Sequence, residues 1–110
     1  MIFGGGKCIR DYVFVGDVAR ANLMALNKAT NQAINIGTGI KTDVNKLYDI
    51  ICKVTGFEKK ALNGPDRPGD IPANYLNVQK AEKVLNWKPE ISLEEGIKKT
   101  YNFFKKNAER

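Results

Sequence analysis

Residues 9–19 read IRDYVFVGDVA, a stretch in which β-forming side chains give way to the start of a helix. Residues 9–15 are rich in β-branched and aromatic residues, follow a run of three glycines, and therefore predict a strand. Asp17 is a residue type that caps helices, and the residues from Val18 to Leu26 are apolar over most of the helix circumference. Such a helix is buried on more than one side, so we expect it to need two covering surfaces.

The remainder of the chain predicts three more helices but only one more strand. The predicted elements are a strand at 33–36, a helix from Thr42 or Asp43 to Gly56, a helix at 78–85, and a helix from the capping box at Ser92 to about Lys106. Two short strands are fewer than a sheet usually contains. A buried apolar strand also needs a neighbouring strand on each edge. We therefore expect an α/β chain that belongs to a larger layer system or completes itself by self-association.

The loop from Phe57 to Tyr75 contains three prolines and several turn residues, and a long, rigid, polar loop is more often functional than idle. Arg67 lies in this loop, and Arg10 lies on the first predicted strand. Two arginines on rigid elements can clamp a diphosphate through bidentate hydrogen bonds. The alternative is that both arginines form internal ion pairs, Arg10 with Asp17 and Arg67 with Asp66 or Asp70.

The composition excludes several classes of function. The chain has 110 residues, a net charge of +6 and no histidine, so Ser-His-Asp and Cys-His nucleophiles and a histidine general base are absent from it. Cys8 and Cys52 lie far apart without a CxxC pair, so we expect no metal site, and reduced thiols are favoured over a disulfide. The basic residues are scattered, which argues against nucleic-acid binding. No membrane span or signal peptide is evident, so a single cytoplasmic domain is expected.

Motifs for a bound dinucleotide or for proton transfer are also weak. Gly37-Thr38-Gly39 lies between a predicted strand and a predicted helix, but Thr42 stands where the third glycine of GxGxxG would be. A tight turn is therefore favoured over a phosphate loop. The single Tyr-x-x-x-Lys match, Tyr101 to Lys105, lies on the last predicted helix, where it is typical of a core tyrosine beside a solvated lysine. We predict no catalytic residue and no bound cofactor.

Four ordered blocks, at residues 2–19, 35–39, 67–71 and 85–97, resemble those of the extended short-chain dehydrogenase/reductase family. Within it the NAD-dependent nucleotide-sugar epimerases and dehydratases are most similar, the UDP-glucose 4-epimerases above all. The resemblance covers the last third of such an enzyme. It implies that residues 1–110 form a single partial domain, the C-terminal substrate-binding part of that fold, mostly helical with two or three short strands. The NAD-binding Rossmann domain and the catalytic Tyr-x-x-x-Lys would then lie in a preceding segment.

The same resemblance implies a role for six residues. Arg10 and Arg67 contact the diphosphate, Val44 packs on the base, Asp70 reaches the ribose, and Tyr12 and Asn74 lie near the nucleotide. The implied partner is a UDP-sugar, with no nucleic acid or membrane, and NAD is the cofactor of the intact enzyme only. The implied function is to anchor UDP while the sugar's C4 exchanges a hydride with NAD, this chain being inactive alone. The alternative is a stand-alone interaction or regulatory module without catalysis.

Overall fold

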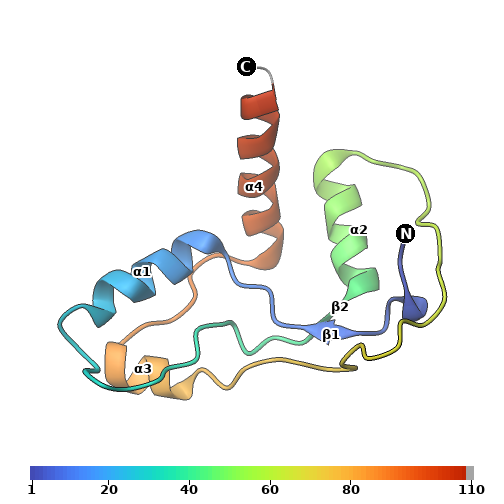
Figure 1. Ribbon diagram of the computed structural model, residues 1–110. Helices are drawn as coiled ribbons and strands as arrows, with labels where there is room; N and C mark the ends of the chain where they lie inside the picture. Colours follow the sequence, from blue (N-terminus) through green and yellow to red (C-terminus); the bar gives the residue numbers. More distant parts are fainter. Residues whose placement is uncertain (109–110) are drawn as a thin grey trace.

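The computed structural model describes residues 1–108, which form four helices, one short 3₁₀ turn and a two-stranded sheet (Figure 1). The elements are η1 (Gly4–Gly6), β1 (Ile9–Arg10), α1 (Val15–Ala25), β2 (Thr42–Asp43), α2 (Val44–Thr55), α3 (Gln79–Leu85) and α4 (Leu93–Ala108). The expectation of a mostly helical α/β chain is confirmed. No helix within residues 1–108 is long and apolar enough to cross a membrane.

The sheet is centred on β1, which is paired on both edges. β1 lies antiparallel to β2, with Ile9 opposite Asp43 and Arg10 opposite Thr42. On its other edge Ile9 forms a parallel bridge to Ala73. The N–H of Ile9 donates to the Pro72 carbonyl and the N–H of Asn74 donates to the Ile9 carbonyl, each at 2.9 Å. The late loop therefore supplies a third extended segment beside the two short strands.

The predicted strands at 9–15 and 33–36 are largely wrong. Only Ile9 and Arg10 are paired as a strand in the first, and residues 33–36 form no strand. Both edges of β1 are occupied by residues 42–43 and 72–74, so the segment 33–36 finds no free edge there. Ile34 and Ile36 pack instead against the small apolar core.

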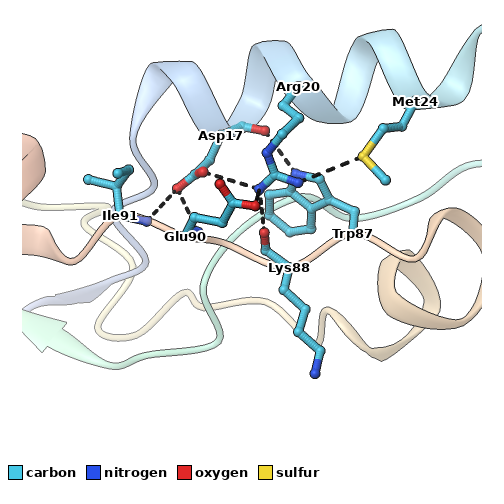
Figure 2. A network of polar contacts seen from close by, with 7 residues as sticks. All are labelled: Asp17, Arg20, Met24, Trp87, Lys88, Glu90 and Ile91. Carbon is cyan, nitrogen blue, oxygen red and sulfur yellow. Dashed lines mark hydrogen bonds and ion pairs between the residues drawn. The ribbon is translucent and has the colours of Figure 1, made fainter.

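Asp17 does not cap α1, contrary to the prediction from its position in sequence. The helix begins at Val15 with Phe14 as its N-cap, and Asp17 lies in the first turn, only 2% exposed. Its carboxylate accepts hydrogen bonds from the N–H groups of Glu90 and Ile91, at 3.2 and 3.1 Å (Figure 2). The capping capacity of Asp17 is thus used by a turn more than seventy residues away, rather than by its own helix.

The core joins α1, α3 and the turn that follows α3. It consists of four buried residues: Ala21, Ala81, Leu85 and Trp87. The indole N–H of Trp87 donates to the Asp17 carbonyl at 2.9 Å, and the Arg20 guanidinium lies over the Trp87 ring (Figure 2). Arg20 also forms an ion pair with the Asp17 carboxylate at 3.2 Å. Apolar burial and buried polar contacts therefore converge on one tryptophan.

The two remaining helices, α2 and α4, pack side by side (Figure 1). The Asp43 carboxylate accepts from the Lys46 N–H at 2.7 Å, and Gly56 ends α2 with a φ of 74°. The Ser92 hydroxyl oxygen accepts from the N–H of Glu95, so Ser92 is the N-cap of α4, as predicted. These three local predictions are confirmed.

The molecule is unusually open for its size. Its radius of gyration is 16.4 Å, whereas a compact domain of about 100 residues has a radius near ~13 Å. The thinnest dimension is 20 Å. Along α1 and at its C-cap, Val15, Leu23 and Leu26 are 73, 70 and 77% exposed. The helix is thus covered on one side only. Its outer face is apolar and exposed, although the sequence predicts that this side is covered as well.

Candidate functional site

A pocket of about 230 Å³ opens beside β1 and gathers most of the predicted site residues. It is lined by Met1, Ile2, Phe3, Cys8, Arg10, Tyr12, Val44, Arg67 and Asp70. Five of the six predicted substrate-binding residues are in this set, and they come from the N-terminal segment, the start of α2 and the long loop. The sixth, Asn74, does not line the pocket and contributes instead a backbone hydrogen bond to Ile9.

Arg10 is held by backbone rather than by a carboxylate. Its Nη1 donates to the carbonyls of Ile9 and Ile71, both at 2.8 Å. The predicted alternative, an ion pair with Asp17, is wrong, because Asp17 pairs with Arg20. Within residues 1–108 no carboxylate lies within ion-pair distance of Arg10, so its charge is available to an anion in the pocket.

Arg67 is presented by a tight turn. The Asp70 N–H donates to the Arg67 carbonyl at 3.2 Å, and Gly69 has a φ of 86°. Pro68 and Gly69 at the two central positions are typical of a type II turn, which requires a positive φ at the second of them. The Arg67 Nε lies 3.5 Å from the Asp70 carboxylate, so that predicted ion pair forms. The Arg67 side chain is 59% exposed, and an exposed pair of this kind is weak enough to admit a ligand.

Phe3 is not among the predicted site residues, yet it lines this pocket beside Arg67. The Arg67 guanidinium carbon is 4.9 Å from the Phe3 ring centroid. Phe3 is held there because Ile2 forms a parallel bridge to Asn63, with hydrogen bonds of 2.6 Å to Leu62 and 2.7 Å from Gly64. In the sequence, the only signal for Phe3 is that it lies close to Arg10. The bridge that positions Phe3 joins segments about sixty residues apart, so no local pattern indicates it.

Asp11 lies between two pocket residues but turns to the other side of the backbone. Its carboxylate accepts from the Thr38 N–H at 2.9 Å, the Thr38 hydroxyl at 2.6 Å, the Gly39 N–H at 2.8 Å and the Leu76 N–H at 3.4 Å. Burial alone raises the pKa of Asp11, but the hydrogen bonds from these groups outweigh burial and lower the pKa below its ordinary value of 3.8. Asp11 is therefore ionised at neutral pH.

The turn at 37–39 is shaped by that carboxylate. The N–H groups of Thr38 and Gly39 point at Asp11, so they are not free to receive a phosphate. The prediction that Gly37-Thr38-Gly39 forms a turn rather than a phosphate loop is consistent with these contacts. In residues 1–108 no group of three or more Cys, Asp or Glu side chains is placed to hold a metal ion.

Comparison with known sequences places these features in one family. The family model described as GDP-mannose 4,6 dehydratase matches residues 1–100. A UDP-glucose 4-epimerase homologue of Methanocaldococcus jannaschii is 52% identical over 107 residues, covering 97% of this chain and 34% of the relative. The UDP-glucose 4-epimerase of Mycolicibacterium smegmatis is 38% identical over 109 residues, 98% of this chain and 35% of its own length. The chain thus spans about a third of the length of these relatives.

Solved structures agree with the sequence comparison. The UDP-glucose 4-epimerase of Thermotoga maritima, determined with UDP-glucose, has a TM-score of 0.94 and 46% identity, covering 97% of this chain and 35% of that one. The enzyme of Bifidobacterium longum, determined with NAD⁺ and UDP, has a TM-score of 0.84 and 30% identity over 96% of this chain and 32% of its own. The chain therefore belongs to the GDP-mannose 4,6 dehydratase family, whose epimerase members its motifs resemble, and it corresponds to the C-terminal part of UDP-glucose 4-epimerases.

Proposed function

We propose that residues 1–110 form the UDP-sugar-binding part of an NAD-dependent UDP-glucose 4-epimerase. The observation that supports this most is the convergence of Arg10 and Arg67 on one pocket, although they lie far apart in the sequence. Guanidinium groups are well suited to phosphate because their fork of N–H donors matches two oxygens at once. One of the two, Arg10, has no competing carboxylate within ion-pair distance among the described residues.

The other pocket residues complete the proposed nucleotide site. Val44 gives an apolar surface for the base, Asp70 offers acceptors for the ribose hydroxyls, and Tyr12 lies on the same wall. Asn74 is proposed to act near the nucleotide from the segment that borders β1. By holding the non-reacting UDP, this part would keep the sugar C4 in place for hydride transfer elsewhere in the enzyme. Binding energy from remote groups is an established way to lower a reaction barrier.

We propose that this chain does not bind NAD, the cofactor of the intact family. Its pyrophosphate needs a glycine-rich turn with free N–H groups at a helix start, and those of the 37–39 turn are bonded to Asp11. The Tyr101–Lys105 match lies on α4, whose residues do not line the pocket. We therefore propose that this chain binds the nucleotide sugar without transforming it.

Titration calorimetry tests this proposal directly. We expect the 110-residue chain to bind UDP and UDP-glucose weakly, and to show no epimerase turnover when NAD is added. A salt-sensitive preference for single-stranded DNA over UDP would contradict the proposal, as would measurable turnover. Failure to bind UDP even at millimolar concentration would leave the alternative, an interaction module that keeps the fold without the ligand.

The outer face of α1 supports a second proposal, that this chain also has a protein partner. Its exposed apolar residues are Val15, Leu23 and Leu26, and the two charged residues of the helix, Asp17 and Arg20, turn to the core. An apolar groove of about 310 Å³ adjoins it, between residues 12–15 and the start of α4. We propose that in a full-length enzyme the rest of the chain covers this face, and that copies of the 110-residue chain cover it by self-association.

A charge introduced on this face should separate the copies. The double variant Leu23→Lys/Leu26→Lys is expected to shift the purified chain from oligomer to monomer, because two lysines make burial of the face costly while the core is untouched. Sedimentation or light scattering measures the shift. The control is Thr30→Lys/Gln32→Lys, which adds the same charge at exposed positions just after α1. A wild-type chain that stays monomeric at high concentration and binds no apolar dye would contradict the proposal.

A further inference from the structure

We propose that Asp11 is a positioning residue for the nucleotide pocket, whose carboxylate holds the segment that presents Arg10 and Tyr12. The inference rests on the proposed function, because it concerns how the same pocket recognises UDP. It does not place Asp11 in contact with the ligand.

The first support is the placement of three consecutive side chains. Arg10 and Tyr12 both line the pocket, whereas Asp11 does not. The Asp11 carboxylate lies instead against the turn at 37–39, and a Cβ added at Gly37 would come within 2.8 Å of its Oδ2. Residues two apart on an extended backbone face the same way and the one between faces the other. Hydrogen bonds that hold the Asp11 side chain against the turn at 37–39 therefore also fix the direction in which Arg10 and Tyr12 point.

The second support is the scarcity of backbone hydrogen bonds between Arg10 and Val13, the next residue that packs against the core. The last paired residue of β1 is Arg10, opposite Thr42, so Tyr12 lies two residues beyond the end of the sheet. Within residues 1–108, the backbone of residues 11–13 forms no hydrogen bond to the backbone of another segment. The contacts of the Asp11 side chain supply the missing anchor. They tie the segment to the turn at 37–39 and, through the N–H of Leu76, to the residue that directly follows the loop carrying Arg67.

The sign of the effect on binding distinguishes positioning from charge. UDP is an anion, and a nearby carboxylate repels it, so a purely electrostatic role predicts that Asp11→Asn strengthens UDP binding. A positioning role predicts the opposite. The amide nitrogen of asparagine cannot accept hydrogen bonds from Gly39 and Leu76, so the backbone loosens just beyond the sheet, and the side chains of Arg10 and Tyr12 are no longer held toward the pocket. We expect UDP affinity to fall by about tenfold, which corresponds to about 1.4 kcal/mol, close to the contribution of one charge-assisted hydrogen bond.

A double-mutant cycle shows through which residue Asp11 acts. UDP affinity is measured by calorimetry for the wild-type chain, Asp11→Asn, Arg10→Ala and the double variant. If Asp11 acts through Arg10, its substitution adds little once Arg10 is gone, whereas independent effects add. Asp49→Asn, an exposed aspartate on α2 that does not line the pocket, is the matched control and should bind like wild type. Full additivity in the cycle, or unchanged or tighter binding by Asp11→Asn, would overturn the inference.

A second pair of variants keeps the test decisive if Asp11→Asn does not fold, which circular dichroism reveals. Thr38→Ala removes the hydroxyl that donates to Asp11 but leaves the carboxylate and its charge, and we expect about a threefold loss of UDP affinity. Thr38→Ser keeps the hydroxyl and should restore binding. Equal affinity of the two Thr38 variants would also overturn the inference. If the wild-type chain binds no UDP, the proposed function fails and this inference falls with it. If the wild-type chain binds UDP and the substitutions at Asp11 and Thr38 leave the affinity unchanged, this inference fails while the proposed function stands.

Discussion

Replacing Arg67 by alanine is expected to abolish UDP binding at accessible concentrations, a loss of about 10- to 100-fold. Hydrogen bonds between a charged donor and an anion contribute about 1.5–3 kcal/mol each, and each 1.4 kcal/mol is a factor of ten in affinity. The substitution also leaves Asp70 without its cation, so a carboxylate would face the diphosphate unpaired. Both effects act in the same direction, which is why this single change is expected to outweigh any other in the pocket.

Two comparisons separate the proposed role of Arg67 from a general loss of charge. Arg67→Lys keeps the charge but loses the fork of donors, and should retain part of the affinity. Lys60→Ala removes a cation from the same loop at an exposed position outside the pocket, and should bind like wild type. Calorimetry with UDP measures all three. Equal losses for Arg67→Ala and Lys60→Ala would mean that net charge, rather than the geometry of the turn, governs binding.

The elements that the sequence predicts well are those set by neighbouring residues. Asp43 and Gly56 bound α2, and Ser92 begins α4, because each satisfies backbone groups within one helical turn of itself. The same reasoning fails at Asp17, whose carboxylate serves Glu90 and Ile91 instead of its own helix. A capping residue is recognisable in sequence, but which segment it caps depends on the tertiary fold.

The strand at 33–36 fails for a related reason. Its apolar, β-branched composition is correct for a strand, but both edges of β1 are taken by residues 42–43 and 72–74, and Ile34 and Ile36 pack against the core instead. The pocket shows the same limit. The rigidity of their surroundings points to Arg10 and Arg67 in the sequence, yet their meeting depends on tertiary contacts of the long loop: the bridge between Ile9 and Ala73 and the bridge between Ile2 and Asn63. The second bridge leaves no local pattern, and Phe3, which depends on it, was missed.

Truncation of Trp87 to alanine is expected to cause one of the two largest losses of stability in the chain. Trp87 is 1% exposed and is one of only four residues in the buried cluster. Removing a large aromatic side chain from a core costs about 3–5 kcal/mol, and a whole domain is stable by about 5–15 kcal/mol. An open molecule with so small a core lies at the lower end of that range, so about 0–2 kcal/mol would remain, and we expect up to about half of the Trp87→Ala chain to be unfolded at 25 °C. Urea denaturation followed by far-UV circular dichroism measures the loss.

Three further variants identify what the tryptophan contributes. Trp87→Phe keeps much of the apolar volume but loses the indole N–H that donates to the Asp17 carbonyl, so it should cost less than alanine. Asp17→Ala leaves the N–H groups of Glu90 and Ile91 without their acceptor and Arg20 without its ion pair, so a loss comparable to Trp87→Ala is expected. Lys83→Ala, exposed on α3, should change stability by less than ~0.5 kcal/mol. If Trp87→Ala unfolds no more readily than Lys83→Ala, the α1–α3 cluster is not what holds this half of the molecule, and the cover supplied by a partner on the outer face of α1 must hold it instead.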